Sequence, residues 1–208
     1  IRGEKSDIPP DPCESTSLFE GLGPNAISCV YVNGAAVIRG FTVTNGYTRG
    51  VLENGKVSHG SYITMGGGVC GSGSAYDCVL TGCAGYRGGA GYQSKFYNCV
   101  FDGNKAVYGG GATSGSYHYG CLAKNNVCTG NSGWKSFFYW SAVENCTILD
   151  SMGGPLNYDR VLKNTLVWGD VGGCDWQARE GPRHDVRQLR ELRVRRPRDG
   201  QHPLVFLP

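Results

Sequence analysis

A short pattern recurs along the chain and constrains its fold more than any other feature. It consists of Asn, Cys, any residue and an apolar residue, followed by a polar turn that contains Gly, Asn or Asp. Six segments align on it without gaps, and they are 38–43, 76–81, 97–102, 124–129, 144–149 and 163–168. From residue 76 onward the interval is about 20 residues, which is typical of a β-solenoid whose coils stack about 4.8 Å apart. The repeat therefore predicts an all-β fold, a β-solenoid of about six or seven coils.

The residue types in the repeat suit such a coil. Asparagine tolerates the left-handed backbone conformation, and stacked amides can hydrogen-bond along the rod. We therefore expect four asparagines at the same bend of successive coils, and they are Asn98, Asn125, Asn145 and Asn164. Each aligned cysteine and the apolar residue two places on should point inward together, as for Cys99 and Phe101. Because cysteine is small and readily buried, we expect a stack of core thiols, formed by Cys78, Cys99 and Cys146.

Composition excludes several other classes of protein. Glycine accounts for 34 of the 208 residues and aromatic residues for 11%. Glycine in a helix interior costs roughly 1 kcal/mol, which excludes a coiled coil or other long helix. The lack of a strict Gly-X-Y period excludes collagen, and the aromatic and β-branched content argues against a disordered chain. Glycine clusters between the repeats permit bends that a Cβ would block.

Three segments follow from the limits of the repeat. Residues 1–22 are expected to be an irregular N-terminal lead, 23–173 the parallel β-helix, and 174–208 an irregular tail. The tail holds eight arginines and five acidic residues, so it carries all of the net charge of +3. The body is neutral, so no nucleic-acid surface is predicted there. Three interpretations of the tail remain open: a basic helix over 185–196 that binds an anionic partner or membrane surface, a disordered end, and a frame-shifted sequence. We assign no function to the tail.

The cysteines and histidines do not indicate a metal or a cofactor. Ten cysteines occur without a CxxC pair, and there are four histidines, so a structural zinc site is not expected. An even number of cysteines fits disulfides in an oxidising compartment, although the pairing does not follow from sequence. The chain contains no run of 18 apolar residues, so no transmembrane helix is predicted.

Two stretches resemble a known family. The run at 98–111 combines Asn-Cys-x-apolar with Gly-Asn-x-Ala and Gly-Gly-Gly, and the stretch 23–46 is similar to first coils of the same kind. Both resemble right-handed parallel β-helix proteins of the polymorphic-outer-membrane-repeat and pectate-lyase-like kind, over roughly residues 23–173. The resemblance implies that the solenoid is a single-stranded right-handed parallel β-helix of about six or seven coils, in a secreted or cell-surface bacterial protein. That family mixes adhesins, autotransporter passengers and carbohydrate-active enzymes, so two hypotheses stand. One is a non-catalytic repeat module that acts in adhesion or glycan contact through a lateral face, with a polysaccharide or a host or cell-surface glycan as its partner. The other is a fragment of a polysaccharide lyase or glycoside hydrolase.

The enzyme hypothesis needs carboxylates and a base that converge. Three acids follow expected strands, namely Asp102, Asp150 and Asp170. They occupy different positions of the repeat, so a shared calcium site is not predicted, and solvated turn acids are the simpler interpretation. The alternative catalytic set is Asp102 and Asp150 with Lys105 or Lys124, if these meet in a groove. No paired aspartates of the glycosidase type occur.

Aromatic residues supply the candidate binding site. Seven of them fall within 24 residues, from Tyr117 to Trp140. Outward tyrosine and tryptophan rings can stack on sugars, and the predicted ligand-binding residues are Tyr117, Tyr119, Trp134, Tyr139 and Trp140. The alternative is that the run 137–140 straddles a bend and is mostly core. His118 lies between two tyrosines and is interpreted as a surface strand residue rather than a general base.

Overall fold

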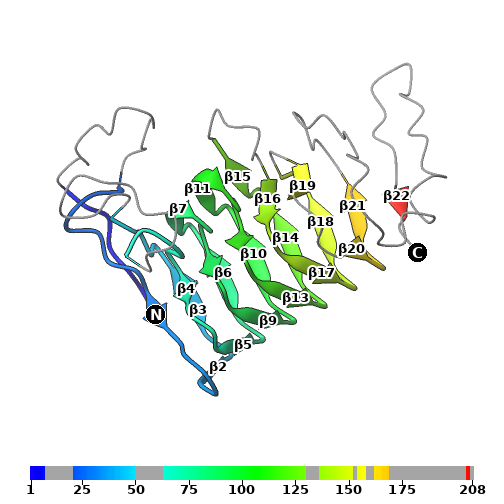
Figure 1. Cartoon of the computed structure of the whole chain (residues 1–208), viewed down its shortest axis with the longest axis horizontal. Coiled ribbons are helices and arrows are strands. Elements are labelled where there is room, and N and C mark those ends of the chain that lie inside the picture. The colour runs from blue at the N-terminus through cyan, green and yellow to red at the C-terminus, as the bar shows by residue number, and fades with distance from the viewer. Residues whose placement is uncertain are drawn as a thin grey trace.

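The structure is a computed structural model that describes residues 1–7, 21–49, 63–129, 136–151 and 162–168, and the backbone of two further strands. These residues form 22 short strands and no helix. The strands stack side by side as a β-solenoid (Figure 1). The prediction of an all-β fold with parallel stacked coils is therefore confirmed. Of the expected tail 174–208, only the backbone of strand β22 lies within the described residues.

The strands lie on four faces, which the chain visits in the same order in each coil. Face 1 contains β1 (Val30–Tyr31), β4 (Val69–Cys70), β8 (Gly91–Tyr92), β12 (Thr113–Ser114), β16 (Ser136–Tyr139) and β19 (Gly154–Asn157). Face 2 contains β2 (Val37–Arg39), β5 (Ser74–Tyr76), β9 (Lys95–Tyr97), β13 (Tyr117–Tyr119), β17 (Ala142–Glu144) and β20 (Leu162–Lys163). Face 3 contains β3 (Thr42–Thr44), β6 (Val79–Thr81), β10 (Val100–Asp102), β14 (Leu122–Lys124), β18 (Thr147–Leu149) and β21 (Leu166–Trp168). Face 4 contains β7 (Ala84–Arg87), β11 (Lys105–Gly109) and β15 (Val127–Cys128).

Six parallel strands stack on each of faces 1, 2 and 3. We call one run of the chain through faces 1, 2 and 3 a pass. The described residues therefore make six passes, and the four that lie between β4 and β18 have a neighbouring pass on both sides. At the C-terminal end, β22 (Val205–Phe206) pairs antiparallel with β21. At the N-terminal end, the residues expected as an irregular lead join the first pass, because Arg2 pairs with Thr44 and Glu4 with Ile27.

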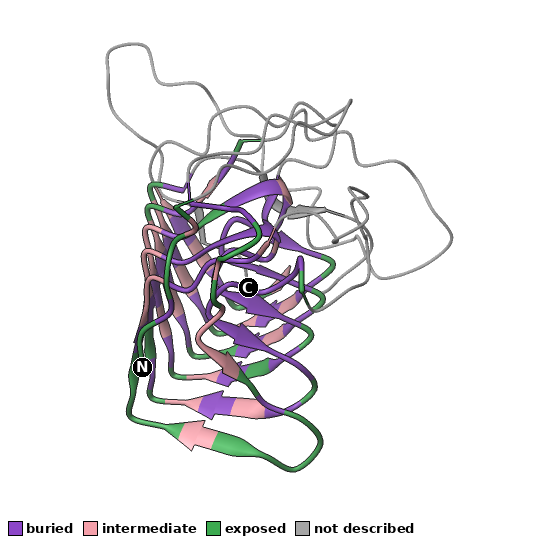
Figure 2. Ribbon diagram, turned by 90° about the vertical axis from the view of Figure 1, so that its left-hand side faces the viewer, coloured by how far each residue is buried: buried purple, intermediate pink, exposed green. Residues whose placement is uncertain are grey.

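Side chains alternate between core and surface along each short strand. The middle residue of the three-residue strands on faces 2 and 3 is buried from the second pass on, while its neighbours are more exposed (Figure 2). Large and small residues complement one another in adjacent coils, since Phe101 is in register with Leu80 on one side and with Ala123 on the other. Cys99 and Phe101 point inward together, as predicted. The core is therefore a column of side chains with the same spacing as the strands.

The register corrects the predicted alignment in the fourth pass. Val100 pairs with Leu122, and Leu122 with Thr147, so Cys121 follows Cys99 in the stack of thiols. The segment 124–129 was aligned wrongly because the true repeat there begins with glycine, Gly120, in place of asparagine. Asn125 consequently lies at the next bend. The first segment, 38–43, was also displaced, by one residue, since Arg39 pairs with Tyr76.

Left-handed residues form the bends between faces. The bend between faces 2 and 3 is made by Gly40, Asp77, Asn98, Gly120, Asn145 and Asn164, all with positive φ. The predicted stacking of Asn98, Asn145 and Asn164 at one bend is thus confirmed. The bend between faces 3 and 4 uses Asn45, Gly82, Gly103, Asn125 and Asp150 in the same way. Only glycine and short polar residues adopt this conformation readily, which explains the composition of the repeat.

From the second pass on, a buried cysteine, serine, threonine or asparagine follows each of these bends. Cys146 shows the pattern, because its thiol donates to Glu144 O at 3.1 Å and its sulfur accepts the N–H of Cys121 at 3.3 Å. Ser141 repeats it on another bend, donating to Tyr139 O and accepting from Ser116 N at 3.2 Å. Residues of this kind close their own bend and satisfy an amide of the preceding coil, as Thr165 and Ser151 also do. The predicted thiol stack is confirmed and includes Cys121, and the eight cysteines within the described residues are all free.

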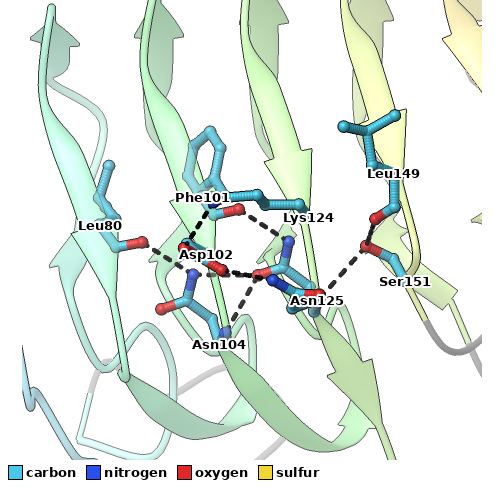
Figure 3. Close-up of polar contacts among 9 residues, drawn as sticks. Leu80, Phe101, Asp102, Asn104, Lys124, Asn125, Leu149 and Ser151 are labelled. Atoms are coloured by element: carbon cyan, nitrogen blue, oxygen red, sulfur yellow. Dashed lines mark hydrogen bonds and ion pairs between the residues drawn. The ribbon is translucent and has the colours of Figure 1, made fainter.

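Two buried asparagines form the corresponding ladder between faces 3 and 4 (Figure 3). Asn104 Nδ2 donates to Leu80 O at 3.0 Å and to Asn126 Oδ1 at 3.0 Å. Asn126 Oδ1 also accepts the backbone N–H of Asn104, while its Nδ2 donates to Phe101 O at 3.1 Å. The amides that hydrogen-bond within the core are therefore not the bend asparagines of the repeat but these two, which follow the next bend.

Asn126→Leu is expected to lower the free energy of unfolding by about 2–4 kcal/mol, because it leaves the buried backbone N–H of Asn104 without its acceptor and removes the side-chain hydrogen bonds to Asn104 and Phe101. The matched control is Asn125→Gly at the adjacent exposed bend, where φ is 55°; it should change stability by less than about 1 kcal/mol. Urea unfolding of both variants measures the difference. Equal losses would show that the ladder does not stabilise the fold.

The structure corrects the interpretation of His118, which is a core residue and not a surface residue. Its exposure is 0%. The imidazole stacks on Phe96 at 5.3 Å and lies 4.5 Å from the ring of Phe138. Its Nε2 is 2.7 Å from Thr113 Oγ1, and its Nδ1 is buried without a hydrogen-bond partner. Burial lowers the pKa of His118 to about 3, so the ring is neutral at physiological pH.

Acid should destabilise the protein through His118. The unfolded chain binds a proton on this residue below its usual pKa of 6.5, whereas the folded chain resists protonation down to about pH 3. The free energy of unfolding therefore falls as pH decreases from 6.5 towards 3, by an amount on the order of 5 kcal/mol in total. His118→Phe keeps an aromatic ring and should remove this part of the pH dependence. Thermal unfolding between pH 7 and 4 tests it, and identical slopes in the two proteins would contradict it.

Candidate functional site

Outward-facing tyrosines line face 2, and we call this surface the tyrosine face, defined by Tyr76, Tyr97, Tyr117 and Tyr119. The rings of Tyr76 and Tyr97 stack with centroids 4.6 Å apart and planes within 10°. Tyr97 also contacts Tyr117 at 5.9 Å in a tilted arrangement. Arg39 lies over the outer side of the Tyr76 ring, with its guanidinium carbon 4.8 Å from the centroid. The result is a ladder of rings parallel to the rod.

The geometry of the coil produces this ladder. The first and third residues of the face 2 strands point outward, and strand pairing brings Tyr76 and Tyr97, the third residues of β5 and β9, into register. The next ring contact runs diagonally, from Tyr97 to Tyr117 at the first position of β13. Tyr119, at the third position of β13, is in register with Tyr97 and Glu144 and keeps 43% of its surface exposed. Tyr117 is in register with Ala142, a residue too small to cover its ring. The β13 end of the ladder is therefore its most accessible part.

Trp140 borders the same face, at the bend that leads from β16 into β17. It has a left-handed backbone, with φ 53°, where neighbouring coils place Gln93 and Gly115. The indole is 49% exposed and stacks on the buried Tyr139, with centroids 6.0 Å apart and planes within 18°. A bulky residue in this conformation carries a conformational cost of about 1 kcal/mol or more. An exposed aromatic ring held at such a cost is a candidate contact residue.

Polar and charged groups flank the rings. Asp77 and Asn98 lie at the bend between faces 2 and 3, directly after the last residues of β5 and β9. There Asn98 Nδ2 donates to Asp77 Oδ1 at 3.4 Å. Asn145 occupies the same bend next to the β13 end of the ladder and is exposed. Partial burial raises the pKa of Tyr117, and the negative charge of Glu144 adds to this effect. Aromatic faces and hydrogen-bonding groups thus alternate across the surface.

The predicted ligand-binding residues do not all reach this surface. Tyr117 and Tyr119 are outward on β13, and Trp140 is exposed at the edge. Tyr139 is buried at 5% exposure, because the run 137–140 crosses from a core strand into a bend, and Trp134 lies outside the described residues. Two rings escaped the prediction, Tyr76 and Tyr97. Both immediately precede the bend residue of the repeat, Asp77 or Asn98. A tyrosine recurring at that position in two aligned repeats was the sequence feature that could have indicated stacked, outward-facing rings.

The alternative catalytic residues come together only in part. Asp102 Oδ2 and Lys124 Nζ form an ion pair of 3.1 Å on face 3, and Asn125 Nδ2 donates to Asp102 Oδ1 at 2.9 Å (Figure 3). The Asn125 hydrogen bond and the lysine lower the pKa of Asp102, so the carboxylate is not a proton donor near neutrality. Lys105 begins β11 on face 4, and Asp150 lies two coils away from Asp102. Asp170 lies outside the described residues.

Neither a search of the described residues for metal-binding groups and membrane-spanning helices nor a comparison with known proteins identifies a further site. In the described part of the chain, no three histidine, cysteine or acidic side chains are grouped so as to hold a metal ion, and no helix there has the length and apolarity to cross a bilayer. No family model matches the chain, and no curated protein or solved structure matches it significantly.

Trp140 can be removed without disturbing its bend. Trp140→Gly places at φ 53° the residue that adopts this conformation most easily, whereas Trp140→Ala keeps the unfavourable Cβ. We expect the glycine variant to be more stable than the alanine variant by about 1 kcal/mol, as measured by chemical unfolding. A more stable alanine variant would contradict the assignment of a left-handed bend to Trp140.

Proposed function

We propose that the chain is a non-catalytic carbohydrate-binding module of a secreted or cell-surface protein, and that it contacts glycans along the tyrosine face. The observation that carries the proposal is the continuous ladder of Tyr76, Tyr97 and Tyr117, which leads to the exposed rings of Tyr119 and Trp140. Aromatic rings with polar edges are the surfaces on which sugar rings stack. The β-solenoid supplies a rigid, straight support for an extended glycan.

The polar neighbours of the ladder fit the same role. Sugar hydroxyls both donate and accept hydrogen bonds, and the surface offers carboxylates, as in Asp77 and Glu144, and amides, as in Asn145. Lys95 and Lys163 are exposed on the same face, so positive and negative groups are mixed. Such a surface favours a hydroxyl-rich ligand over a polyanion that requires a concentrated positive patch.

The alternative, a fragment of a lyase or hydrolase, has weaker support. It required Asp102, Asp150 and a lysine to converge in a groove. In the structure Asp102 and Lys124 neutralise each other, and Asp150 lies at a bend two coils away. A surface ion pair of this kind contributes little beyond local order.

The test is binding of soluble glycans to the full chain. Mannan, mixed-linkage β-glucan and polygalacturonate are titrated in turn by calorimetry or affinity electrophoresis. We expect at least one to bind, and we expect Tyr119→Ser and Trp140→Gly each to weaken that binding at least tenfold, which corresponds to about 1.4 kcal/mol. Gln93→Gly is the matched control, because it alters the equivalent bend in a neighbouring coil without removing an aromatic ring, and it should bind as the parent chain does.

Three outcomes would count against the proposal. The first is that none of the glycans binds, and the second is that the aromatic variants bind as tightly as the Gln93→Gly control. The third is ultraviolet-absorbing unsaturated products accumulating from polygalacturonate, with the activity lost in Asp102→Ala. That result would establish the lyase alternative.

A further inference from the structure

Cys29 differs from the other cysteines that the structure describes. Of these eight thiols it alone is not buried; the other seven, Cys83 among them, have little or no exposure. Cys29 precedes β1 in the first pass, and Cys83 precedes β7 in the second. Each of the two thiols is the leading influence on the pKa of the other. A partly exposed thiol in the first coil thus lies close to a buried thiol in the second.

The backbone around the pair converges on one small volume. Cys29 Sγ lies 3.2 Å from Thr44 O, and Cys83 Sγ lies 3.9 Å from Val43 O, the carbonyl of the preceding residue. Glycine at position 46 makes room for the pair, since a Cβ there would lie 2.7 Å from Cys29 Sγ. The packing therefore holds both sulfur atoms against the same stretch of β3.

The environment also favours the thiolate at the exposed position. The Cys83 side chain lowers the pKa of Cys29, and the N–H of Gly3 acts in the same direction, against the opposing effect of burial. The Cys29 side chain and complete burial raise the pKa of Cys83. An accessible, thiolate-prone cysteine beside a second thiol is the arrangement found in redox-sensitive pairs.

We propose that Cys29 and Cys83 form a redox-sensitive pair, in which oxidation by a peroxide joins the first coil to the second through a disulfide. The Cys29 thiolate attacks the O–O bond and becomes a sulfenic acid, while the other oxygen leaves as hydroxide and takes up a proton to form water. The Cys83 sulfur then attacks the Cys29 sulfur, the S–O bond breaks, and a second water forms with the proton of the Cys83 thiol. Two thiols and one peroxide thus yield one disulfide and two waters.

The buried thiol stack provides an internal comparison. The Cys99 and Cys146 side chains both raise the pKa of Cys121, and Cys146 Sγ accepts the N–H of Cys121 at 3.3 Å, so proximity between cysteines is not unique to the proposed pair. These three residues have exposures of 3% or less, and peroxide has no direct access to them in the folded protein. Exposure of one partner is what distinguishes Cys29 and Cys83.

The experiment uses the full chain with Cys13 and Cys174, which lie outside the described residues, replaced by serine. This reduced reference protein is treated with one equivalent of hydrogen peroxide, its free thiols are counted, and its peptides are mapped by mass spectrometry without reduction. We expect the loss of two thiols per chain, a peptide linkage between Cys29 and Cys83, a raised melting temperature, and reversal of all three by dithiothreitol. The rise follows because the crosslink restricts the unfolded chain.

Variants separate the proposed pair from general oxidation. Cys29→Ser should retain its remaining thiols at the same peroxide dose, whereas Cys121→Ser should form the Cys29–Cys83 linkage as the reference does. In Cys83→Ser the reaction should stop at the Cys29 sulfenic acid, which dimedone traps. If that variant fails to fold, dimedone added to the reference protein during oxidation should instead label Cys29. A linkage between other cysteines, equal thiol loss in Cys29→Ser, or no thiol loss in the reference would overturn the proposal.

Discussion

The bends between faces depend on one recurring interaction, in which a side chain just after a left-handed residue hydrogen-bonds in two directions. Its hydroxyl or thiol closes the bend by donating to a carbonyl two residues back, and its oxygen or sulfur accepts an amide from the preceding coil, as Ser141 does for Ser116 and Cys146 for Cys121. A strand of three residues offers few backbone hydrogen bonds of its own. The bends therefore carry much of the register between coils, which a slip of one residue would invert.

The inward positions and the bend positions together determine the fold, so the outward positions of the strands are not restricted by it. Inward positions hold the column of apolar side chains, and the bend positions are restricted to glycine and small polar residues. Face 2 uses its free positions for tyrosines, which stack at 4.6 Å because the coils beneath them repeat at nearly that distance. An ordered aromatic surface of this kind forms without a pocket. Its order comes directly from the repeat of the scaffold.

The sequence was sufficient to predict the architecture because the bend residues and the thiols are chemically distinctive. It was insufficient wherever a bend used glycine, since Gly120 in place of asparagine concealed the coil that contains Cys121. His118 was misplaced for a different reason: a polar residue between two tyrosines suggests a surface, whereas the alternation of the strand directs the middle side chain inward, against Phe96 and Phe138. Tyr76 and Tyr97 were overlooked because their position was used to align the repeat and not considered as a surface.

Residues that depart from the rules of the scaffold are the most informative about function. Cys83 is buried, as the thiols of the stack are, but Cys29 remains partly exposed, and no feature of the fold requires a thiol there. Trp140 departs further, because the bend it occupies is served equally by Gly115 and Gln93 in the neighbouring coils. A left-handed tryptophan with an exposed indole lowers stability without improving the core. The proposed glycan contact gives this exposed indole a role that the fold itself does not, and Trp140 lies at the bend that leads into face 2.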